Sequence, residues 1–547
     1  MTRRVLLIGA SGVFGSRLAT MLAPMPGLEL VLAARDSARL ERLQNALARQ
    51  CPGATVFVQV FDRARTETLE QIRPWLVIDA SGPFQIAHYE LALASVRQGA
   101  HYLDLADGRA FVAGFPAAVG AAATEAGVLA VTGASSTPAL SHAVVRAITG
   151  GWRSLDEVVV AISPGARAPR GLSVVRAILS YAGRPVRVYR KGGWATAPGW
   201  SGARRLDMPG LGRRLGSVCE TPDLDLLPES FPIRQQALFL AGLEQPLLHR
   251  GLALLSLPVR WGWVRSLRPL ARPLRAMAGW LAPLGSDRGG MVVEACGRDG
   301  ADQPIRARWA LWAEANAGPN TPAAPAAALV RALLNGRSFA PGGVACTALL
   351  DLDAILNELA HLPIHTQIDE GHPKSAILYR RLLGRRFDAL PAAVRQVHGC
   401  EGVARFKGRA VTRSGSSLAA QILRRVLGLP PTGRSEVEVT LHSAPNGETW
   451  TRQFGSARFS STLTDAGRLG LFQERFGPIW FTFRLEPIPR GVRWRMIGWA
   501  AVGLPLPLWL APKTRARAEE VDGRYRFRVV VAHPWLGLLF AYRGHLA

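Results

Sequence analysis

One stretch decides the fold of the N-terminal part of this 547-residue chain: Val5-Leu6-Leu7-Ile8-Gly9-Ala10-Ser11-Gly12-Val13-Phe14-Gly15. A short apolar run of strand length ends in glycines spaced G-x-x-G-x-x-G, and residues 16–22 then predict a helix. Glycine lets the backbone turn sharply and approach a pyrophosphate, whose charge is stabilised by the helix N-terminus. We therefore expect the turn formed by residues 9–15 to bind the pyrophosphate of a dinucleotide.

The rest of residues 1–150 repeats this strand–helix alternation. Further buried strands are predicted at 28–33, 55–61, 75–80, 101–105 and 128–131, with helical segments between them. Repeated strand–helix units favour an α/β fold with a doubly wound parallel sheet, that is, a Rossmann domain.

The end of the second predicted strand bears on the choice of cofactor. Enzymes that use NAD usually place an acid there, which accepts the ribose hydroxyls. This chain instead has Arg35, twenty residues after Gly15, where a guanidinium can bind a 2′-phosphate. Asp36 follows directly, and the sequence leaves open whether it faces the ribose or pairs with Arg39. We expect NADP as the cofactor, with NAD as the alternative.

Three further motifs carry a family resemblance. Ala80-Ser81-Gly82-Pro83-Phe84, His101-Tyr102-Leu103-Asp104-Leu105 and the Thr137-Pro138 pair resemble the saccharopine dehydrogenase-like family. The resemblance implies that Ser81, Gly82, Pro83 and Phe84 lie beside the cofactor, and that Asp104 and residues 135–138 face the nicotinamide cleft. The family often has Gly-Glu after the Y-x-D stretch, whereas this chain has Ala106-Asp107-Gly108, so the shape of the substrate end stays open.

Candidate catalytic residues come from the same region. The chain has only four lysines, none of them four residues after a tyrosine, which excludes the Y-x-x-x-K pair of short-chain dehydrogenases. His88, Tyr89 and His101 lie near the predicted cleft, and Tyr102 and Asp104 share one face of a strand. We take Tyr102 and Asp104 as the catalytic candidates, with turn capping as the alternative for Asp104. Hydride transfer needs no protein nucleophile, because the cofactor supplies the reactive group.

Residues 151–320 predict an inserted α+β domain with a mixed or antiparallel sheet, and residues 321–362 predict helices that return to the Rossmann core. The family resemblance covers about residues 1–362. Segment 249–288 stands out, since it holds seven arginines and one acid together with Trp261, Trp263 and Trp280. Such a segment can lie on an anionic membrane surface, or it can form a helical cover over the substrate cleft.

Residues 375–547 predict a separate, mainly antiparallel β domain. Alternation from Arg524 to Val529 puts arginines on one face and apolar groups on the other. Gly503-Leu504-Pro505, His533-Pro534 and Tyr542-Arg543-Gly544 resemble the bacterial domain of unknown function that often follows a saccharopine dehydrogenase-like domain. We expect a packed core, with a cupped sheet around a lipid-like ligand as the alternative.

Composition narrows the function classes. The formal charge of +26 lies almost wholly outside residues 1–150, so it either attracts anionic partners or reflects an arginine-rich genome. The five cysteines lie far apart, which predicts no metal site and a reduced, cytoplasmic setting. No motif predicts specific nucleic-acid binding. We expect an NADP-dependent oxidoreductase that acts on an unidentified small molecule. A hydrophobic substrate is one option. A dinucleotide-sensing binding protein and a membrane-surface lipid-handling protein are the alternatives.

Overall fold

The computed structural model describes residues 2–63, 65–169, 171–371, 377–418, 420–422, 428–444, 447–468, 470–501 and 504–547. The chain divides into two compact units, Met1–His372 and Pro373–Ala547. The expected start of the last domain at residue 375 lies outside the described residues, as does Gly503. Among the described helices, none is long and apolar enough to span a membrane.

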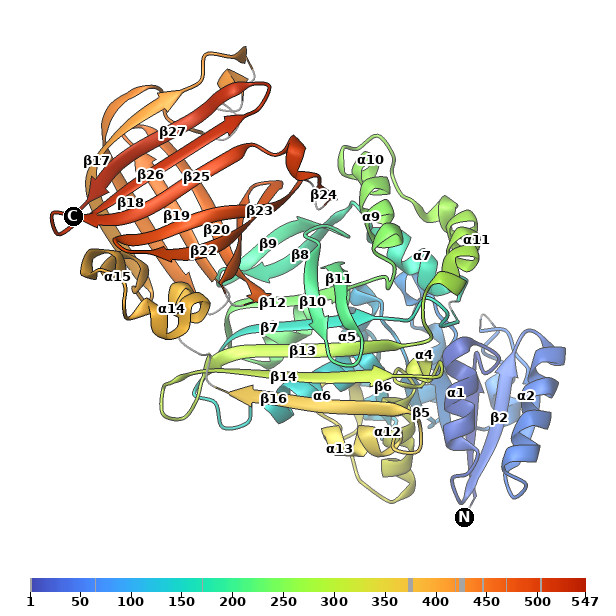
Figure 1. Ribbon diagram of the computed structural model, residues 1–547. Helices are drawn as coiled ribbons and strands as arrows, with labels where there is room; N and C mark the ends of the chain where they lie inside the picture. The colour runs from blue at the N-terminus through green and yellow to red at the C-terminus, as the bar shows by residue number, and fades with distance from the viewer. Residues whose placement is uncertain are drawn as a thin grey trace. The chain divides into compact units, whose positions relative to one another are not determined.

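The first unit contains the predicted parallel sheet (Figure 1). Its strand order is β3-β2-β1-β4-β5-β6-β15, and every neighbouring pair is parallel. The strands are β1 (Arg3–Ile8), β2 (Leu28–Ala34), β3 (Thr55–Val60), β4 (Leu76–Asp79), β5 (His101–Asp104), β6 (Leu129–Thr132) and β15 (Gly342–Ala345). The first six strands follow the Rossmann order, which confirms the predicted fold. Strand β15 was not predicted, because only helices were expected between residues 321 and 362.

Helices cover both faces of this sheet, as the alternation of its strands requires. Val5 and Leu7 belong to one buried cluster, and Leu6 and Ile8 belong to another. The first cluster includes side chains of α1 (Val13–Leu22), α2 (Ser37–Gln50), α6 (Ser141–Ile148), α12 (Ala324–Leu334) and α13 (Leu352–Asn357). The second includes side chains of α3 (Thr68–Ile72), α4 (Glu90–Arg97) and α5 (Arg109–Glu125). The chain after the inserted domain therefore completes the core of the Rossmann domain.

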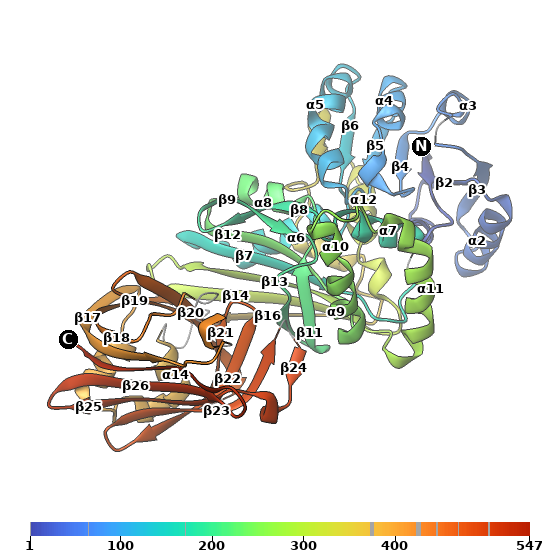
Figure 2. The same cartoon turned by 90° about the horizontal axis from the view of Figure 1, so that it is seen from above.

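The inserted domain is built on a mixed nine-stranded sheet (Figure 2). Its main order is β10-β11-β12-β7-β13-β14-β16, and β8 joins β12 as part of a hairpin with β9. Only β7 and β12 pair in parallel among these described strands. The strands are β7 (Ser154–Ser163), β8 (Pro185–Arg190), β9 (Gly193–Pro198), β10 (Arg204–Met208), β11 (Gly212–Val218), β12 (Ile233–Ala241), β13 (Gly289–Arg298), β14 (Pro304–Ala313) and β16 (Ile364–Gly371). The mixed sheet was predicted, and its edge strand β16 was not.

Five helices of the inserted domain matter for the site. They are α7 (Leu172–Tyr181), α8 (Asp223–Ser230), α9 (Pro246–Leu255), α10 (Leu257–Arg260) and α11 (Ala271–Leu281). Helices α9 to α11 form most of the Trp/Arg segment 249–288, which is helical as expected.

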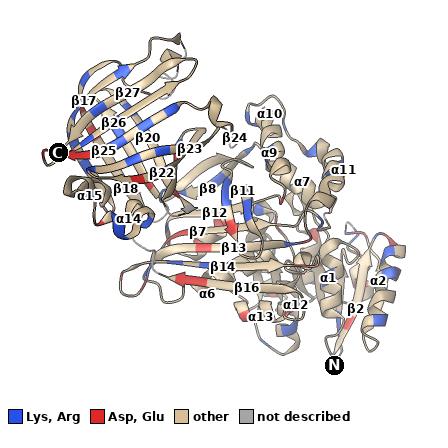
Figure 3. Ribbon diagram, in the orientation of Figure 1, with Lys and Arg blue, Asp and Glu red and all other residues tan. Residues whose placement is uncertain are grey.

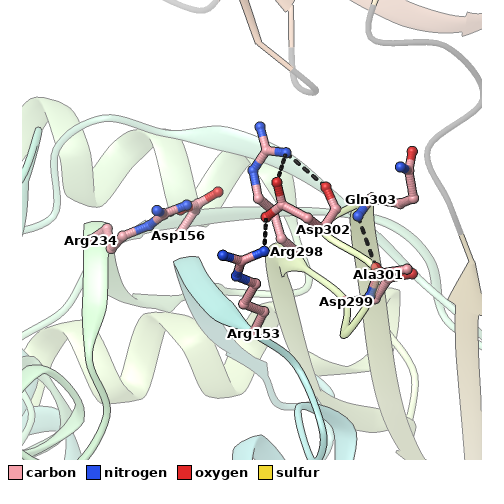
Figure 4. A network of polar contacts seen from close by, with 8 residues as sticks. All are labelled: Arg153, Asp156, Arg234, Arg298, Asp299, Ala301, Asp302 and Gln303. Atoms are coloured by element: carbon pink, nitrogen blue, oxygen red, sulfur yellow. Dashed lines mark hydrogen bonds and ion pairs between the residues drawn. The ribbon is translucent and has the colours of Figure 1, made fainter.

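A surface network fixes one end of the mixed sheet (Figure 4). In the turn between β13 and β14, the Asp299 carboxylate accepts hydrogen bonds from the backbone N–H groups of Ala301 and Gln303. Asp302 pairs with Arg153 and Arg298, and Asp156 pairs with Arg234 nearby. These groups are largely exposed, so the network orders the turn and adds little stability.

The second unit is a closed antiparallel sheet. Ten strands form a ring in the order β22-β21-β20-β19-β18-β17-β27-β26-β25-β23, which closes because β23 pairs with β22. They are β17 (Val403–Ser414), β18 (Gly433–Ala444), β19 (Gly447–Phe454), β20 (Ala457–Arg468), β21 (Leu471–Phe476), β22 (Ile479–Ile488), β23 (Gly491–Ala501), β25 (Lys513–Val521), β26 (Arg524–His533) and β27 (Gly537–Leu546). The short β24 (Leu504–Leu506) adds to β23, and helices α14 (Leu378–Leu383) and α15 (Ala392–His398) precede the ring.

Candidate active site

The glycine turn after β1 has the geometry of a phosphate cradle. Gly9 has a φ of +79°, and Gly12 donates its N–H to the Gly9 carbonyl at 2.9 Å. Gly12 precedes α1 as its N-cap, and among the described residues no side chain caps the free amides of the first turn. These amides and the positive end of the helix dipole can bind a phosphate. The turn therefore fits the pyrophosphate of a dinucleotide.

The other glycines of the turn are fixed by close backbone contacts. A Cβ on Gly15 would lie 2.2 Å from the Gly9 carbonyl oxygen. A Cβ on Gly9 would lie 2.8 Å from the carbonyl carbon of Ala80 and 2.9 Å from the Cα of Ser81. The structure thus brings the turn after β1 against the turn after β4, where the expected cofactor residues Ser81 to Phe84 begin.

The turn after β4 is held by a buried carboxylate that sequence reasoning missed. Asp79 accepts hydrogen bonds from the backbone N–H of Ser81 at 2.9 Å and from its hydroxyl at 2.5 Å. Its other oxygen forms an ion pair of 3.0 Å with Arg63, whose guanidinium lies over the Phe84 ring. Phe84 packs on Phe111 inside the second cluster, so its ring belongs to the core and only its backbone lies at the turn.

The catalytic candidates Tyr102 and Asp104 lie in the interior. Neither has an exposed side chain, and the Tyr102 ring stacks on Phe115 of α5. The Asp104 carboxylate accepts hydrogen bonds from the Gly133 N–H at 2.8 Å, the Ala106 N–H at 2.9 Å and the hydroxyl of Thr132 at 2.9 Å. Burial raises the pKa of Asp104 to about 7, although these three donors act in the opposite direction.

Asp104 therefore joins the turns after β5 and β6, which is the capping role named as its alternative. The side chain of Tyr102 is fully buried in this structure. His101 is also misplaced for catalysis, because it begins β5 at the amino edge of the sheet, where its Nδ1 accepts the Leu129 N–H at 3.1 Å. Tyr89 donates its hydroxyl to the Phe111 carbonyl at 3.0 Å and stays structural.

Two charged residues, Arg35 and Asp36, follow β2 and have different contacts. Asp36 caps α2 by accepting the Arg39 N–H at 3.0 Å, and its carboxylate forms an ion pair of 3.2 Å with the Arg39 guanidinium. Arg35 is exposed directly after the strand. The acid is thus engaged with its own helix, while Arg35 beside it is exposed.

Asp107 is an exposed carboxylate beyond the carboxyl end of β5. It follows β5 by three residues and accepts a hydrogen bond from the Gln85 side chain at 3.1 Å. Asp107 is accessible to solvent, yet desolvation by its surroundings raises its pKa.

Groups of the inserted domain face Asp107. Tyr181 ends α7, and its hydroxyl lies 2.8 Å from the sulfur of Cys219. After burial, which is the main cause, the Asp107 carboxylate also contributes to the raised pKa values of Tyr181 and Cys219, so the three groups lie close together. The sequence placed Asp107 after the predicted strand but gave no signal for Tyr181 or Cys219.

An ion pair joins the Rossmann domain to the inserted domain beside Asp107. Arg109, the first residue of α5, donates to both carboxylate oxygens of Asp225 in α8 at 2.6 and 2.5 Å. Arg187 of β8 donates to the same carboxylate at 2.6 Å. Bidentate arginine–carboxylate pairs fix geometry as well as charge. The Rossmann domain and the inserted domain are therefore tied together next to Asp107.

Comparisons with known proteins give the N-terminal domain its family. Residues 5–143 match the family model described as the saccharopine dehydrogenase NADP binding domain. This chain carries a saccharopine dehydrogenase NADP-binding domain. The match makes the protein an oxidoreductase that uses a nicotinamide dinucleotide, as predicted. Residues 390–546 match a domain of unknown function, DUF4166, which confirms the expected C-terminal domain.

Solved structures give weaker likenesses. Saccharopine dehydrogenase (L-Glu forming) from Saccharomyces cerevisiae is 14% identical with a TM-score of 0.48, over 67% of this chain and 100% of that one. The amine dehydrogenase of Mycobacterium smegmatis is 14% identical with a TM-score of 0.33, over 64% and 97%. GenD2 from gentamicin A biosynthesis, solved with NAD, is 16% identical with a TM-score of 0.31, over 66% and 91%. No curated protein matches the chain.

Proposed function

We propose that the protein is an NADP-dependent oxidoreductase that transfers hydride to or from a small molecule bound beside Asp107. The observation that carries the proposal is the exposed Arg35 next to an Asp36 that is already engaged in capping α2. A guanidinium binds a phosphate through paired hydrogen bonds, so Arg35 favours the 2′-phosphate of NADP. An acid that is free to accept ribose hydroxyls would favour NAD instead.

Each part of the proposed site would have a distinct role. Gly9 to Gly15 would bind the pyrophosphate, and the backbone after β4 would lie along the nicotinamide half. The bound cofactor supplies the hydride. Asp107 is the group we propose for proton transfer, because solvent and a substrate can reach it and because its raised pKa lets it hold a proton nearer neutral pH. The substrate stays open, and a hydrophobic one remains an option.

A titration tests the cofactor assignment. Purified protein is titrated with NADPH and with NADH by fluorescence, alongside Arg35→Ala and Arg49→Ala. Arg49 is a matched control because it is also exposed and lies in the last turn of α2, at the opposite end of that helix from Arg35. We expect Arg35→Ala to weaken NADPH binding by about 10- to 100-fold, the loss of about 1.5–3 kcal/mol for charged hydrogen bonds, with little change for NADH. Equal losses for both nucleotides, or none, would remove the NADP assignment.

A second function is favoured by the exposed tryptophans of the Trp/Arg segment. Trp263 and Trp280 are 76% and 83% exposed, so their rings do not pack as a cover over the cleft. Arg260, Arg265, Arg272 and Arg275 are exposed on the same segment. Tryptophan with arginine is typical of surfaces that bind anionic lipid headgroups. We propose that this segment contacts an anionic membrane from the cytoplasm, a location with which the free thiols of all five cysteines agree.

Vesicle sedimentation tests the membrane contact. Wild-type protein should sediment with vesicles that contain phosphatidylserine, less so with pure phosphatidylcholine, and less again as salt rises. Trp263→Ser combined with Trp280→Ser should reduce sedimentation, whereas Trp194→Ser, an exposed tryptophan on β9, should not. Point variants are preferable to deleting the segment, because His249 and Val259 are buried. Equal sedimentation of all variants would exclude this surface.

A further inference from the structure

The closed sheet of the second unit surrounds a cavity of about 430 Å³. Packed protein cores leave few voids larger than a water molecule, whereas binding sites for small molecules span about 300–1,000 Å³. Aromatic rings supply much of the wall, among them Trp450, Phe459, Phe483, Trp494 and Phe527. The second unit therefore has a buried apolar cluster and also a cavity, whose size and lining suit an apolar ligand.

One end of the cavity is sealed by α14 and α15. Trp494 of β23 donates its indole N–H to the hydroxyl of Tyr379 in α14 at 3.0 Å. His398 at the end of α15 contacts the Tyr525 hydroxyl at 3.0 Å and stacks on Tyr379 with ring centres 3.9 Å apart. Tyr379, His398 and Tyr525 are all buried, so a ligand cannot enter from this end.

The opposite end carries an exposed apolar rim. Leu510 and Leu536 line the cavity, and Leu536 is also 42% exposed. Trp509 and Trp535 next to them are 64% and 67% exposed, and their rings pack edge to face at 5.8 Å. Exposed apolar groups that continue into an apolar cavity mark an entry path. A ligand would therefore enter between the β26–β27 hairpin and the residues that follow β24.

A polar pair lies inside the apolar wall. Arg452 and Glu474 both line the cavity, are only 12% and 14% exposed, and lie 3.6 Å apart. Arg452 donates to the Ser461 hydroxyl at 2.9 Å, and Ser461 donates to Glu474 at 2.7 Å. Burying such a pair costs free energy, so a stable core gains little from it. Together the two side chains offer a donor and an acceptor with no net charge, which suits an uncharged group such as a hydroxyl.

Outside the cavity the same strands carry the charge. Tyr525, Phe527 and Val529 of β26 line the interior, while the arginines at 524, 526 and 528 are exposed, as the alternation predicted. Figure 3 shows basic residues along the strands of the closed sheet. The hydrophilic outer face and the apolar inner face separate the ligand from solvent.

We propose that the closed sheet binds a long-chain or polycyclic alcohol, with its apolar body among the aromatic rings and its hydroxyl at Arg452 and Glu474. The proposal does not depend on the dinucleotide site, because every group it uses lies in the second unit. It assigns a ligand class to a domain that the family match leaves without a function.

A displacement assay on the full chain tests it. Nile red, an uncharged dye whose fluorescence rises in apolar surroundings, is bound to the protein and displaced with 1-hexadecanol or with palmitic acid. We expect saturable dye binding and displacement by hexadecanol at about ten-fold lower concentration than by palmitic acid. A carboxylate would lie beside Glu474, and the two arginines that line the cavity, Arg452 and Arg517, are already paired with Glu474 and Glu519. NADPH should not change either result.

A matched pair of variants tests whether the ligand binds inside the closed sheet. Val529 lines the cavity, and Val530 is the next residue on the same strand, facing outward. Val529→Trp should fill the cavity and abolish hexadecanol-sensitive dye binding, whereas Val530→Trp should leave it unchanged. Near-ultraviolet circular dichroism confirms folding, and Val531→Phe replaces Val529→Trp if that variant does not fold. Absence of dye binding, or equal binding by both tryptophan variants, would overturn the site; equal displacement by acid and alcohol would overturn the hydroxyl assignment.

Discussion

Two alanine substitutions in the turn after β1 should affect different properties. Gly15→Ala should lower stability, whereas Gly12→Ala should weaken nucleotide binding. In Gly15→Ala the new Cβ would lie 2.2 Å from the Gly9 carbonyl oxygen and 2.8 Å from its carbon, where ordinary contact begins at 3.4 Å. Both atoms are backbone, so no side-chain rotation relieves the clash and α1 must move away from β1. Overpacking of this kind costs about 1–3 kcal/mol. In Gly12→Ala the nearest atom is the Gly9 carbonyl oxygen at 3.1 Å, a tight contact that a shift of a few tenths of an ångström relieves, and φ is −78°. We therefore expect a smaller loss of unfolding free energy, of about 0.5 kcal/mol.

Thermal unfolding and nucleotide titration together read out this difference. Gly15→Ala should lower the melting temperature by about 2–12 °C, at about 2–4 °C per kcal/mol for a large domain. Gly12→Ala should melt like wild type but bind NADPH at least about ten-fold more weakly, because its methyl group occupies the space where the pyrophosphate meets the amides of α1. NADPH binding by Gly12→Ala at wild-type strength would refute the phosphate cradle, and a wild-type melting temperature for Gly15→Ala would refute the packing argument.

Three further substitutions test other parts of the two units. Asp104→Ala should destabilise the first unit by about 3 kcal/mol or more in denaturant unfolding, because three buried donors lose their acceptor. Asp107→Asn should lower turnover more than nucleotide binding, and it should remove the fall in carbonyl or imine reduction as pH rises through the raised pKa of Asp107; an unchanged pH profile would exclude Asp107 as the proton donor. Burial lowers the pKa of His398 to about 3 from 6.5, so the neutral form is favoured in the folded state and stability is lost as pH falls below about 6.5. Between about pH 6.5 and 4, the free energy of unfolding of His398→Gln should therefore fall by about 3 kcal/mol less than that of the wild type. Denaturant unfolding at each pH measures the difference.

Local rules were enough for the features that depend on neighbouring residues. The turn from Gly9 to Gly15 was predictable because the strand, the glycines and the helix are consecutive, and the family model matches the same region. The inward and outward faces of β26 followed from alternation, since that sheet is apolar on one side only. Helical structure in the Trp/Arg segment followed from its apolar spacing.

Features that depend on distant pairing were not predictable. Strand β16 is polar and almost wholly exposed, so only its pairing with β14 makes it a strand. Strand β15 consists of small residues and becomes a strand by joining β6. Closure of the C-terminal ring rests on the pairing of β22 with β23 and creates a cavity that no local pattern indicates.

The burial of Tyr102, a catalytic candidate from the sequence, has a physical cause in the fold itself. Alternation along β5 correctly put Tyr102 and Asp104 on one face, but helices cover both faces of a doubly wound sheet, so alternation cannot separate core from cleft. Only the residues beyond the carboxyl ends of the strands reach the cleft. Asp107 lies in that position, three residues past β5, and its partner side chains come from the inserted domain.

The polar groups at the carboxyl edge of the sheet thus fall into two sets: buried carboxylates that hold the turns, and groups beyond the strand ends. Asp79 and Asp104 lie side by side at the ends of β4 and β5, fully buried, and their oxygens hold the turns that position the cofactor loops. A carboxylate that accepts three structural hydrogen bonds cannot move a proton in each cycle without loosening those turns. In the proposed function, proton transfer therefore belongs to groups beyond the strand ends. Because Arg109 and Asp225 tie the Rossmann domain to the inserted domain, Asp107 is held near Tyr181 and Cys219, where we propose that the substrate binds.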